Sequence, residues 1–275
     1  MVKLVFSDLD GTFLTQDKTI TADNARVLDA AYERGVHFVP CTGRNITDIP
    51  GEILRHPAVA HAVCCNGAQV LDVKKGAVLH EVALDKATVL DLYRSVRDLR
   101  VTFDIFADRR VYTPRSRFGY IETVDLSAPT RDFIRAGRTV FDEPVEELLG
   151  KVGDVCRLNI FFHTRAERDE VWRAVDARPS LIRTTSLACN VEITDACAHK
   201  GAALAWLCGL LGVSPVDTVA FGDNENDVTM LRAAGDGVAM ANAVPACRAA
   251  SDHMTSSCDD SGVARYLSIL FGIQT

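Results

Sequence analysis

A short apolar run at residues 2–6 leads directly into the sequence DLDGT at residues 8–12. A continuous apolar run of this length favours a buried strand of a parallel sheet. In open α/β sheets, ligands bind beyond the carboxyl ends of the strands. Two carboxylates at such an end form a site for a hard cation and also offer a nucleophile. The sequence therefore predicts a chemically active end of the first strand.

Strand and helix signals alternate through the first 70 residues and again through the tail. A helix start at Thr21 is followed by an apolar stripe that Gly35 closes. This alternation is typical of a doubly wound, Rossmann-like parallel sheet of the α/β class. The other predicted segments are strands at Val36–Pro40, Ala62–Cys65, Asp217–Phe221 and Gly237–Met240, and helices at Gly201–Leu211, Asp227–Ala234 and Pro245–Ala250.

The pattern changes between these two halves, where strand-like segments mix with amphipathic helices. We predict a discontinuous core domain, 1–82 and 188–275, interrupted by an inserted α+β domain at 83–187 of about 100 residues, long enough to fold as its own unit. The strand at Asn190–Thr194 is expected to return to the core. The other expected segments of the insert are strands at 102–106, 111–113 and 155–163, helices at 87–99 and 165–177, and loops at 113–118 and 129–138.

Composition excludes several classes of partner. A formal net charge of −7 argues against nucleic acid, because phosphate backbones are bound by an excess of Lys and Arg. The longest apolar stretch, Ala202–Val213, covers about half of a bilayer and is interrupted by glycines. We expect no membrane association, and the first residues reach Asp8 too soon for a secretory signal. The sequence does not indicate an oligomeric state.

The nine cysteines are scattered and include no CxxC pair. This spacing does not fit a zinc site. We therefore expect the cysteines to pack as small buried apolar side chains, in a protein of a reducing, cytoplasmic compartment.

Four short clusters lie at predicted strand or helix ends, and together they form one chemical set. Asp8, Asp10 and Asp223 supply the oxygen ligands that Mg²⁺ prefers. Thr42 offers a hydroxyl and the amides after it to phosphate oxygens, and Lys200 offers an ammonium to the same anion. A carboxylate that attacks a phosphate dianion meets like charge, which a divalent ion and a lysine neutralise.

Each cluster has a structural interpretation when it is taken alone. Paired acids after a strand also suit a solvated turn or a helix cap, and Thr42-Gly43 suits a turn. Lys200 alone is compatible with a solvent-exposed position. Gly222-Asp223 alone is compatible with a turn at the end of a strand, with Asp227 capping the next helix. The chemical interpretation therefore rests on all four clusters together.

The four clusters, in this order, resemble the signature of the haloacid dehalogenase superfamily, and the chain looks like one of its Cof-type phosphatases. Residues 8–12 match the motif DxDGT, 42–44 match TGR, 200–201 match KG and 222–227 match GDxxND. The segments NGA at 66–68 and AMANA at 239–243 resemble further parts of the same subfamily. The resemblance covers nearly the whole chain.

The resemblance implies a role for each matched residue. Asp8 is the expected nucleophile, and Asp10 the expected acid that protonates the leaving alcohol and then deprotonates water. Thr12 is expected to orient Asp10. Phosphate is expected to bind Thr42, Gly43, Lys200 and Asn226. Mg²⁺ is expected to bind Asp8, the main-chain carbonyl of Asp10, and Asp223, with Asp227 and Asn226 steadying the site from the next turn.

The position of the insert also matches the family. Only 32 positions separate Asp10 from Thr42, whereas 158 separate Thr42 from Lys200. An insert between the threonine and lysine motifs corresponds to the family's C2-type (C2B) cap, and the resemblance implies that this cap excludes water and favours small phosphorylated metabolites.

We therefore expect a Mg²⁺-dependent phosphomonoester hydrolase that acts through an aspartyl-phosphate, with sugar phosphates as the first substrate candidates and pyridoxal phosphate and phosphoglycolate as rivals. Two alternatives remain: a phosphomutase of the same superfamily, and a receiver-like signalling module that accepts a phosphoryl group. A basic run at residues 109–117 suits either substrate contact or a solvated hairpin, and His199 suits either substrate contact or solvent.

Overall fold

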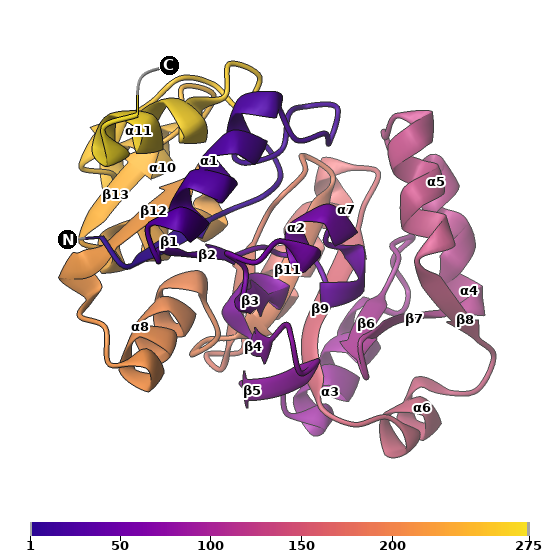
Figure 1. Ribbon diagram of the computed structural model, residues 1–275. Helices are drawn as coiled ribbons and strands as arrows, with labels where there is room; N and C mark the ends of the chain where they lie inside the picture. Colours follow the sequence, from indigo (N-terminus) through magenta and orange to yellow (C-terminus); the bar gives the residue numbers. More distant parts are fainter. Residues whose placement is uncertain (1, 274–275) are drawn as a thin grey trace. The chain divides into compact units, whose positions relative to one another are not determined.

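The structure is a computed structural model that describes residues 2–273 (Figure 1). The described residues form two compact units, one from residues 2–81 and 198–273, here called the core unit, and one from residues 82–197, here called the insert. No helix within residues 2–273 is long and apolar enough to cross a membrane.

The core unit contains one parallel sheet, one antiparallel sheet and the helices around them. Its strands are β1 (Leu4–Ser7), β2 (His37–Pro40), β3 (His61–Cys64), β4 (Gln69–Asp72), β5 (Ala77–Glu81), β12 (Thr218–Gly222), β13 (Asp236–Ala239) and β14 (His253–Met254). Its α-helices are α1 (Ala22–Glu33), α2 (Gly51–Arg55), α8 (Lys200–Leu211), α9 (Val228–Ala233), α10 (Pro245–Ala250) and α11 (Gly262–Phe271). Short 3-10 turns are η1 (Ile46–Asp48), η2 (Cys65–Gly67), η4 (Pro215–Asp217) and η5 (Glu225–Asp227).

The parallel sheet has the order β14-β13-β12-β1-β2, which confirms the predicted doubly wound core. The residues of β1 are fully buried, as the continuous apolar run predicted. Because Ser7 lies opposite Phe221 in the register of β1 and β12, both strands end at the same edge of the sheet. The polar segments that follow these two strands therefore start side by side.

The third predicted strand, β3, is present but does not continue the parallel sheet as a regular member. It pairs antiparallel with β4, and β4 pairs with β5, in a separate three-stranded sheet. A single parallel bridge joins Cys41 to Val63, and the Thr42 amide donates to the Val63 carbonyl at 2.9 Å. This junction fixes the loop after β2 against β3.

Close packing of α8 on α9 explains the glycine after Lys200. A Cβ on Gly201 would lie 2.3 Å from the backbone oxygen of Thr229. We expect Gly201→Ala to lower the free energy of unfolding by about 1–3 kcal/mol through overpacking. Gly209 in the same helix has no atom within 4 Å of such a Cβ. Gly209→Ala is therefore the matched control and should raise stability by about 0.5–1 kcal/mol.

Urea unfolding of both variants tests this packing. Equal effects of the two substitutions would contradict it, because helix propensity alone would then account for both.

The insert contains one six-stranded sheet with the order β10-β11-β9-β6-β7-β8. An apolar core that includes Phe103, Leu158 and Ile193 packs on one face of this sheet. The strands are β6 (Asp104–Ala107), β7 (Arg110–Pro114), β8 (Arg138–Phe141), β9 (Val155–Phe161), β10 (Leu181–Thr184) and β11 (Asn190–Asp195). The helices are α3 (Lys86–Val96), α4 (Arg115–Phe118), α5 (Ala128–Ala136), α6 (Val145–Lys151) and α7 (Arg165–Asp176), with the 3-10 turn η3 (Gly119–Thr123).

Two expectations about the insert are wrong. The strand at Asn190–Thr194 does not return to the core, because β11 pairs with both β9 and β10 of the insert sheet. The second boundary accordingly falls after residue 197 rather than after residue 187. The expected loops at 113–118 and 129–138 contain α4 and most of α5, where Ser127 caps the first turn and Pro129 lies near the helix start. Proline is tolerated in a first turn, so it did not mark a loop.

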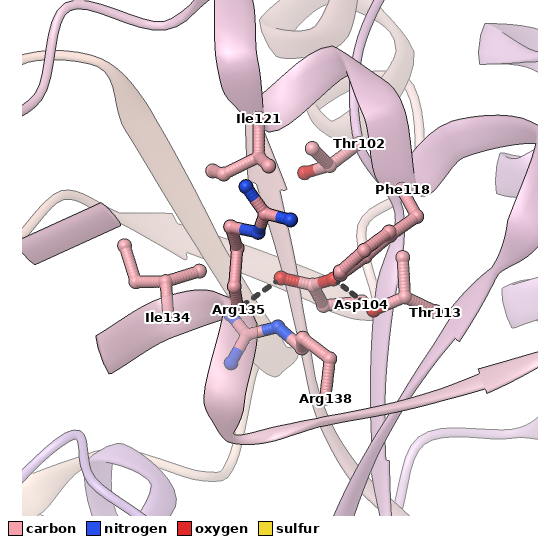
Figure 2. A pocket seen from close by; sticks show the side chains of 8 residues that line it. All are labelled: Thr102, Asp104, Thr113, Phe118, Ile121, Ile134, Arg135 and Arg138. Atoms are coloured by element: carbon pink, nitrogen blue, oxygen red, sulfur yellow. Dashed lines mark hydrogen bonds and ion pairs between the residues drawn. The ribbon is translucent and has the colours of Figure 1, made fainter. Parts of the chain in front are cut away.

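A small pocket inside the insert has a volume of about 10 Å³ (Figure 2). Asp104 lies beside it, accepting hydrogen bonds from the Thr113 hydroxyl at 2.6 Å and from Arg138 at 2.7 Å. This volume suits about one water molecule. Its lining residues include none of the predicted site residues, so it is not the predicted active site; they are Thr102, Asp104, Thr113, Phe118, Ile121, Ile134, Arg135 and Arg138.

Candidate active site

Lys200 is the centre of the predicted site. It is the first residue of α8 and is fully buried, and its ammonium lies 2.6 Å from Asp8 and 2.6 Å from Asp227. Burial by itself lowers the pKa of a lysine, but here the carboxylates of Asp227 and Asp8 outweigh burial and raise the pKa of Lys200. Lys200 therefore carries its positive charge inside the protein.

Asp227 holds the loop after β12 in place. One of its oxygens accepts from Lys200, and the other accepts the amides of Asp223 at 2.9 Å and Asn224 at 3.0 Å. A Cβ on Gly222 would lie 2.4 Å from the Asp227 Cβ, which explains the glycine before Asp223. Both Asp227 oxygens are thus engaged in holding Lys200 and the loop, and the expected part of Asp227 in the metal site stays a prediction.

Three carboxylates, Asp8, Asp223 and Asp227, have oxygens within 4.8 Å of one another. Burial raises the pKa of Asp8 well above its usual range; Lys200 opposes this effect, and neighbouring carboxylates reinforce it. Burial and the charge of Asp227 raise the pKa of Asp223 to about 7. When all three carboxylates are ionised, the cluster has more negative charge than Lys200 neutralises, and oxygen ligands of this kind fit a divalent cation such as Mg²⁺.

Thr12 does not orient Asp10 as expected. Its hydroxyl donates to Asp223 at 2.8 Å, so it holds an expected metal ligand instead. Gly11, which lies between Asp10 and Thr12 in the sequence, has a φ of +82°, and a Cβ there would lie 2.6 Å from an Asp223 oxygen. The glycine of the first motif is therefore required by both its backbone conformation and the close approach of Asp223.

Asp10 is held by two cations. Arg44 donates to both of its oxygens at 2.8 Å, and Lys18 lies 2.7 Å from one of them. Burial alone would raise the pKa of Asp10, but the Arg44 hydrogen bonds and the two positive charges lower it to about 2. The Asp10 side chain is therefore separate from the carboxylate cluster, and its expected metal contact through the main-chain carbonyl stays a prediction.

The other expected phosphate-binding residues, Thr42, Gly43 and Asn226, lie in the segments that follow β2 and β12. Thr42 is buried, and its hydroxyl accepts the Arg44 amide at 3.1 Å across Gly43. Asn226 donates to the side chain of Asn66 at 3.0 Å. Contact of these residues with phosphate stays a prediction.

The segment at residues 65–67 is tightly constrained. Asn66 has a φ of +58°, and a Cβ on Gly67 would lie 2.3 Å from the backbone of His199. The NGA segment therefore packs against the start of α8, which places Lys200.

His199 is the N-cap of α8, with its Nδ1 accepting the Ala202 amide at 3.0 Å. Burial lowers the pKa of His199, which favours the neutral ring that this acceptor role needs. His199 is therefore a half-buried helix cap, and its contact with substrate stays a prediction.

Asn242 is a supporting residue that the sequence analysis did not assign. Its side-chain amide donates to the Gly11 carbonyl at 2.8 Å, and its oxygen accepts the Cys258 amide at 3.1 Å. It links the first motif to the C-terminal loops of the core unit. The sequence signal that could have identified Asn242 is its position in the AMANA segment, which resembles part of the subfamily.

The basic run at 109–117 is structural in part. Arg117 is buried and donates to backbone carbonyls of Arg97, Leu99 and Val101, and Arg115 pairs with Asp142.

The nine cysteines form no disulfide, and seven of them are buried, which matches the expected apolar packing.

Comparisons with known proteins agree over nearly the full length. A family model for haloacid dehalogenase-like hydrolases matches residues 5–267. Phosphatase YwpJ of Bacillus subtilis is 27% identical over 285 residues, covering 97% of this chain and 99% of the relative. From the same organism, 5-amino-6-(5-phospho-D-ribitylamino)uracil phosphatase YwtE is 24% identical over 289 residues, covering 99% of each chain. The solved structure of a haloacid dehalogenase-like hydrolase from B. subtilis has 25% identity and a TM-score of 0.86, covering 98% of this chain and 100% of that chain.

Proposed function

We propose a reaction and a substrate class for this chain, which belongs to the haloacid dehalogenase-like hydrolase family and is a phosphatase. The proposed reaction is Mg²⁺-dependent hydrolysis of small phosphate monoesters through an aspartyl-phosphate. The observation that carries it is the buried Lys200, which pairs with Asp8 beside Asp223 and Asp227.

The first step is attack by an Asp8 oxygen on phosphorus. A bond forms between Asp8 and phosphorus, the bond from phosphorus to the ester oxygen breaks, and Asp10 protonates the departing oxygen. Because Arg44 and Lys18 hold Asp10 ionised in this structure, this step requires that Asp10 first takes up a proton when the negatively charged phosphate binds beside it. In the second step, water attacks the same phosphorus while Asp10 takes a proton from it. Free phosphate leaves, and Asp8 is restored as a carboxylate.

The other residues of the site lower the cost of bringing a phosphate to a carboxylate. Lys200 places a positive charge next to Asp8, and Thr42 and Gly43 offer hydrogen-bond donors to the phosphoryl oxygens. When bound to Asp8, the Asp10 carbonyl and Asp223, with support from Asp227, Mg²⁺ supplies charge neutralisation and alignment of the phosphoryl group. Thr12 and Asn242 keep Asp223 and the first motif in place.

The proposed substrates are small phosphorylated metabolites, with sugar phosphates first among them. The relative YwtE is named for a substrate in which phosphate is attached to a ribityl chain, a polyol related to sugars. The proposal also assigns the chemistry to the core unit and substrate selectivity to the insert, as a C2-type cap domain.

Phosphate release from a panel of phosphate esters tests the proposal. The purified chain, loaded with Mg²⁺, should hydrolyse several small phosphate monoesters, with the highest kcat/KM for a sugar phosphate. Treatment with EDTA should abolish turnover, and excess Mg²⁺ should restore it. Isomerisation of a sugar phosphate with little phosphate release would support a phosphomutase instead.

A further inference from the structure

Arg44 is the part of the second motif that the proposed reaction leaves without a role. Its Nε and one terminal nitrogen donate to the two different oxygens of Asp10, each at 2.8 Å. This is the two-point geometry in which the planar guanidinium matches a carboxylate. It fixes both the position and the plane of the Asp10 carboxylate.

Arg44 is itself anchored on several sides. Its remaining terminal nitrogen donates to the Asp48 carbonyl at 2.7 Å, its amide donates to the Thr42 hydroxyl, and its carbonyl accepts the Cys65 amide at 3.0 Å. The Arg44 side chain is 17% exposed. A residue with its backbone and side chain held in this way transmits a defined position to its partner.

Two other candidates for orienting Asp10 are weaker. Thr12, which the motif suggested, is engaged with Asp223. Lys18 contacts one Asp10 oxygen from a side chain that is half exposed, and an exposed ion pair of a flexible lysine contributes little.

We propose that Arg44 is the positioning residue for Asp10, and that it holds this carboxyl group where it can exchange a proton with the departing ester oxygen. The charge of Arg44 opposes protonation of Asp10, so a loss of rate in the Arg44 variants reports the lost position and not a lost acid strength. The inference rests on the proposed function, because it assumes that Asp10 is the acid of the reaction. Arg44 acts here through Asp10 and not through the phosphoryl group.

Two substrates that differ in their leaving group distinguish this positioning role from a role in phosphate binding or in the fold. Benzyl phosphate has a poor, alkoxide leaving group that needs a proton, whereas p-nitrophenyl phosphate has a good leaving group that does not. General acid catalysis typically contributes about 10²–10⁴-fold. We expect Arg44→Lys and Arg44→Gln to lower kcat/KM for benzyl phosphate by about 10²-fold, and to lower it for p-nitrophenyl phosphate less than about 10-fold.

The ratio of the two kcat/KM values is taken within each variant. A lower fraction of folded enzyme reduces both values equally and therefore does not change the ratio. Lys18→Ala is the comparison variant, because it removes the other cation on Asp10 and leaves the two-point contact with Arg44 intact; it should change the ratio less than Arg44→Gln does. Adding Arg44→Gln to Asp10→Asn should leave the ratio of Asp10→Asn unchanged, since Arg44 acts through that carboxyl.

Equal losses toward both substrates, or no loss, would overturn the inference. Equal losses would assign Arg44 to phosphate binding or to the fold instead. Failure of the proposed function is distinct: Asp10→Asn itself would then show no preference for the better leaving group.

Discussion

Asp8→Asn is expected to reduce kcat by about 10⁴-fold or more, the scale seen when an enzyme loses its nucleophile. An amide at this position has the shape of the carboxylate but cannot form the acyl phosphate. The fold should be intact, because burial already raises the pKa of Asp8 and Lys200 retains Asp227 as a partner. Initial rates of phosphate release and thermal melting measure the two effects.

Asp17→Asn is the matched control for charge, since Asp17 is exposed in the loop after the first motif. It should leave kcat unchanged. A near-normal rate for Asp8→Asn would show that another group attacks phosphorus. An unfolded Asp8→Asn would show that its carboxylate supports the fold.

Lys200→Met is expected to have the second-largest effect, and it should appear in stability as well as activity. The substitution leaves Asp8 and Asp227 buried without their cation. Removing one partner of a buried ion pair typically costs about 3–5 kcal/mol. Urea unfolding should therefore show a loss of this size, and kcat should also fall, by less than in Asp8→Asn.

A double variant distinguishes charge from packing. Asp227→Asn in the Lys200→Met background removes one of the unpaired carboxylates, so it should recover part of the lost stability. Losses that simply add would contradict the electrostatic explanation, because packing defects at two positions do not compensate each other.

The sequence predicted the parallel core and most of the site because both depend on local patterns. The buried run before Asp8 and the one before Asp223 each predicted a strand, and adjacent parallel strands bring their ends together. Gly11, Gly201 and Gly222 have motif positions that the structure explains by close approach of Asp223, Thr229 and Asp227.

What the sequence did not predict depends on partners far along the chain. Thr12 contacts Asp223, which lies 211 positions away, rather than its near neighbour Asp10. The strand at 190–195 carries no local signal for which sheet it joins, and its pairing with β9 decides this. The contact of Arg44 with Asp10 likewise spans 34 positions and needs the fold.

Mass spectrometry of the acid-quenched enzyme tests the central claim most directly. Asp10→Asn, loaded with Mg²⁺ and mixed with p-nitrophenyl phosphate, should accumulate one phosphoryl group, because water attack lacks its base. Peptide mapping should locate this group on Asp8, and Asp8→Asn/Asp10→Asn should carry none. A phosphoryl group on any other residue, or phosphate release from Asp10→Asn with no covalent adduct at any quench time, would contradict the account.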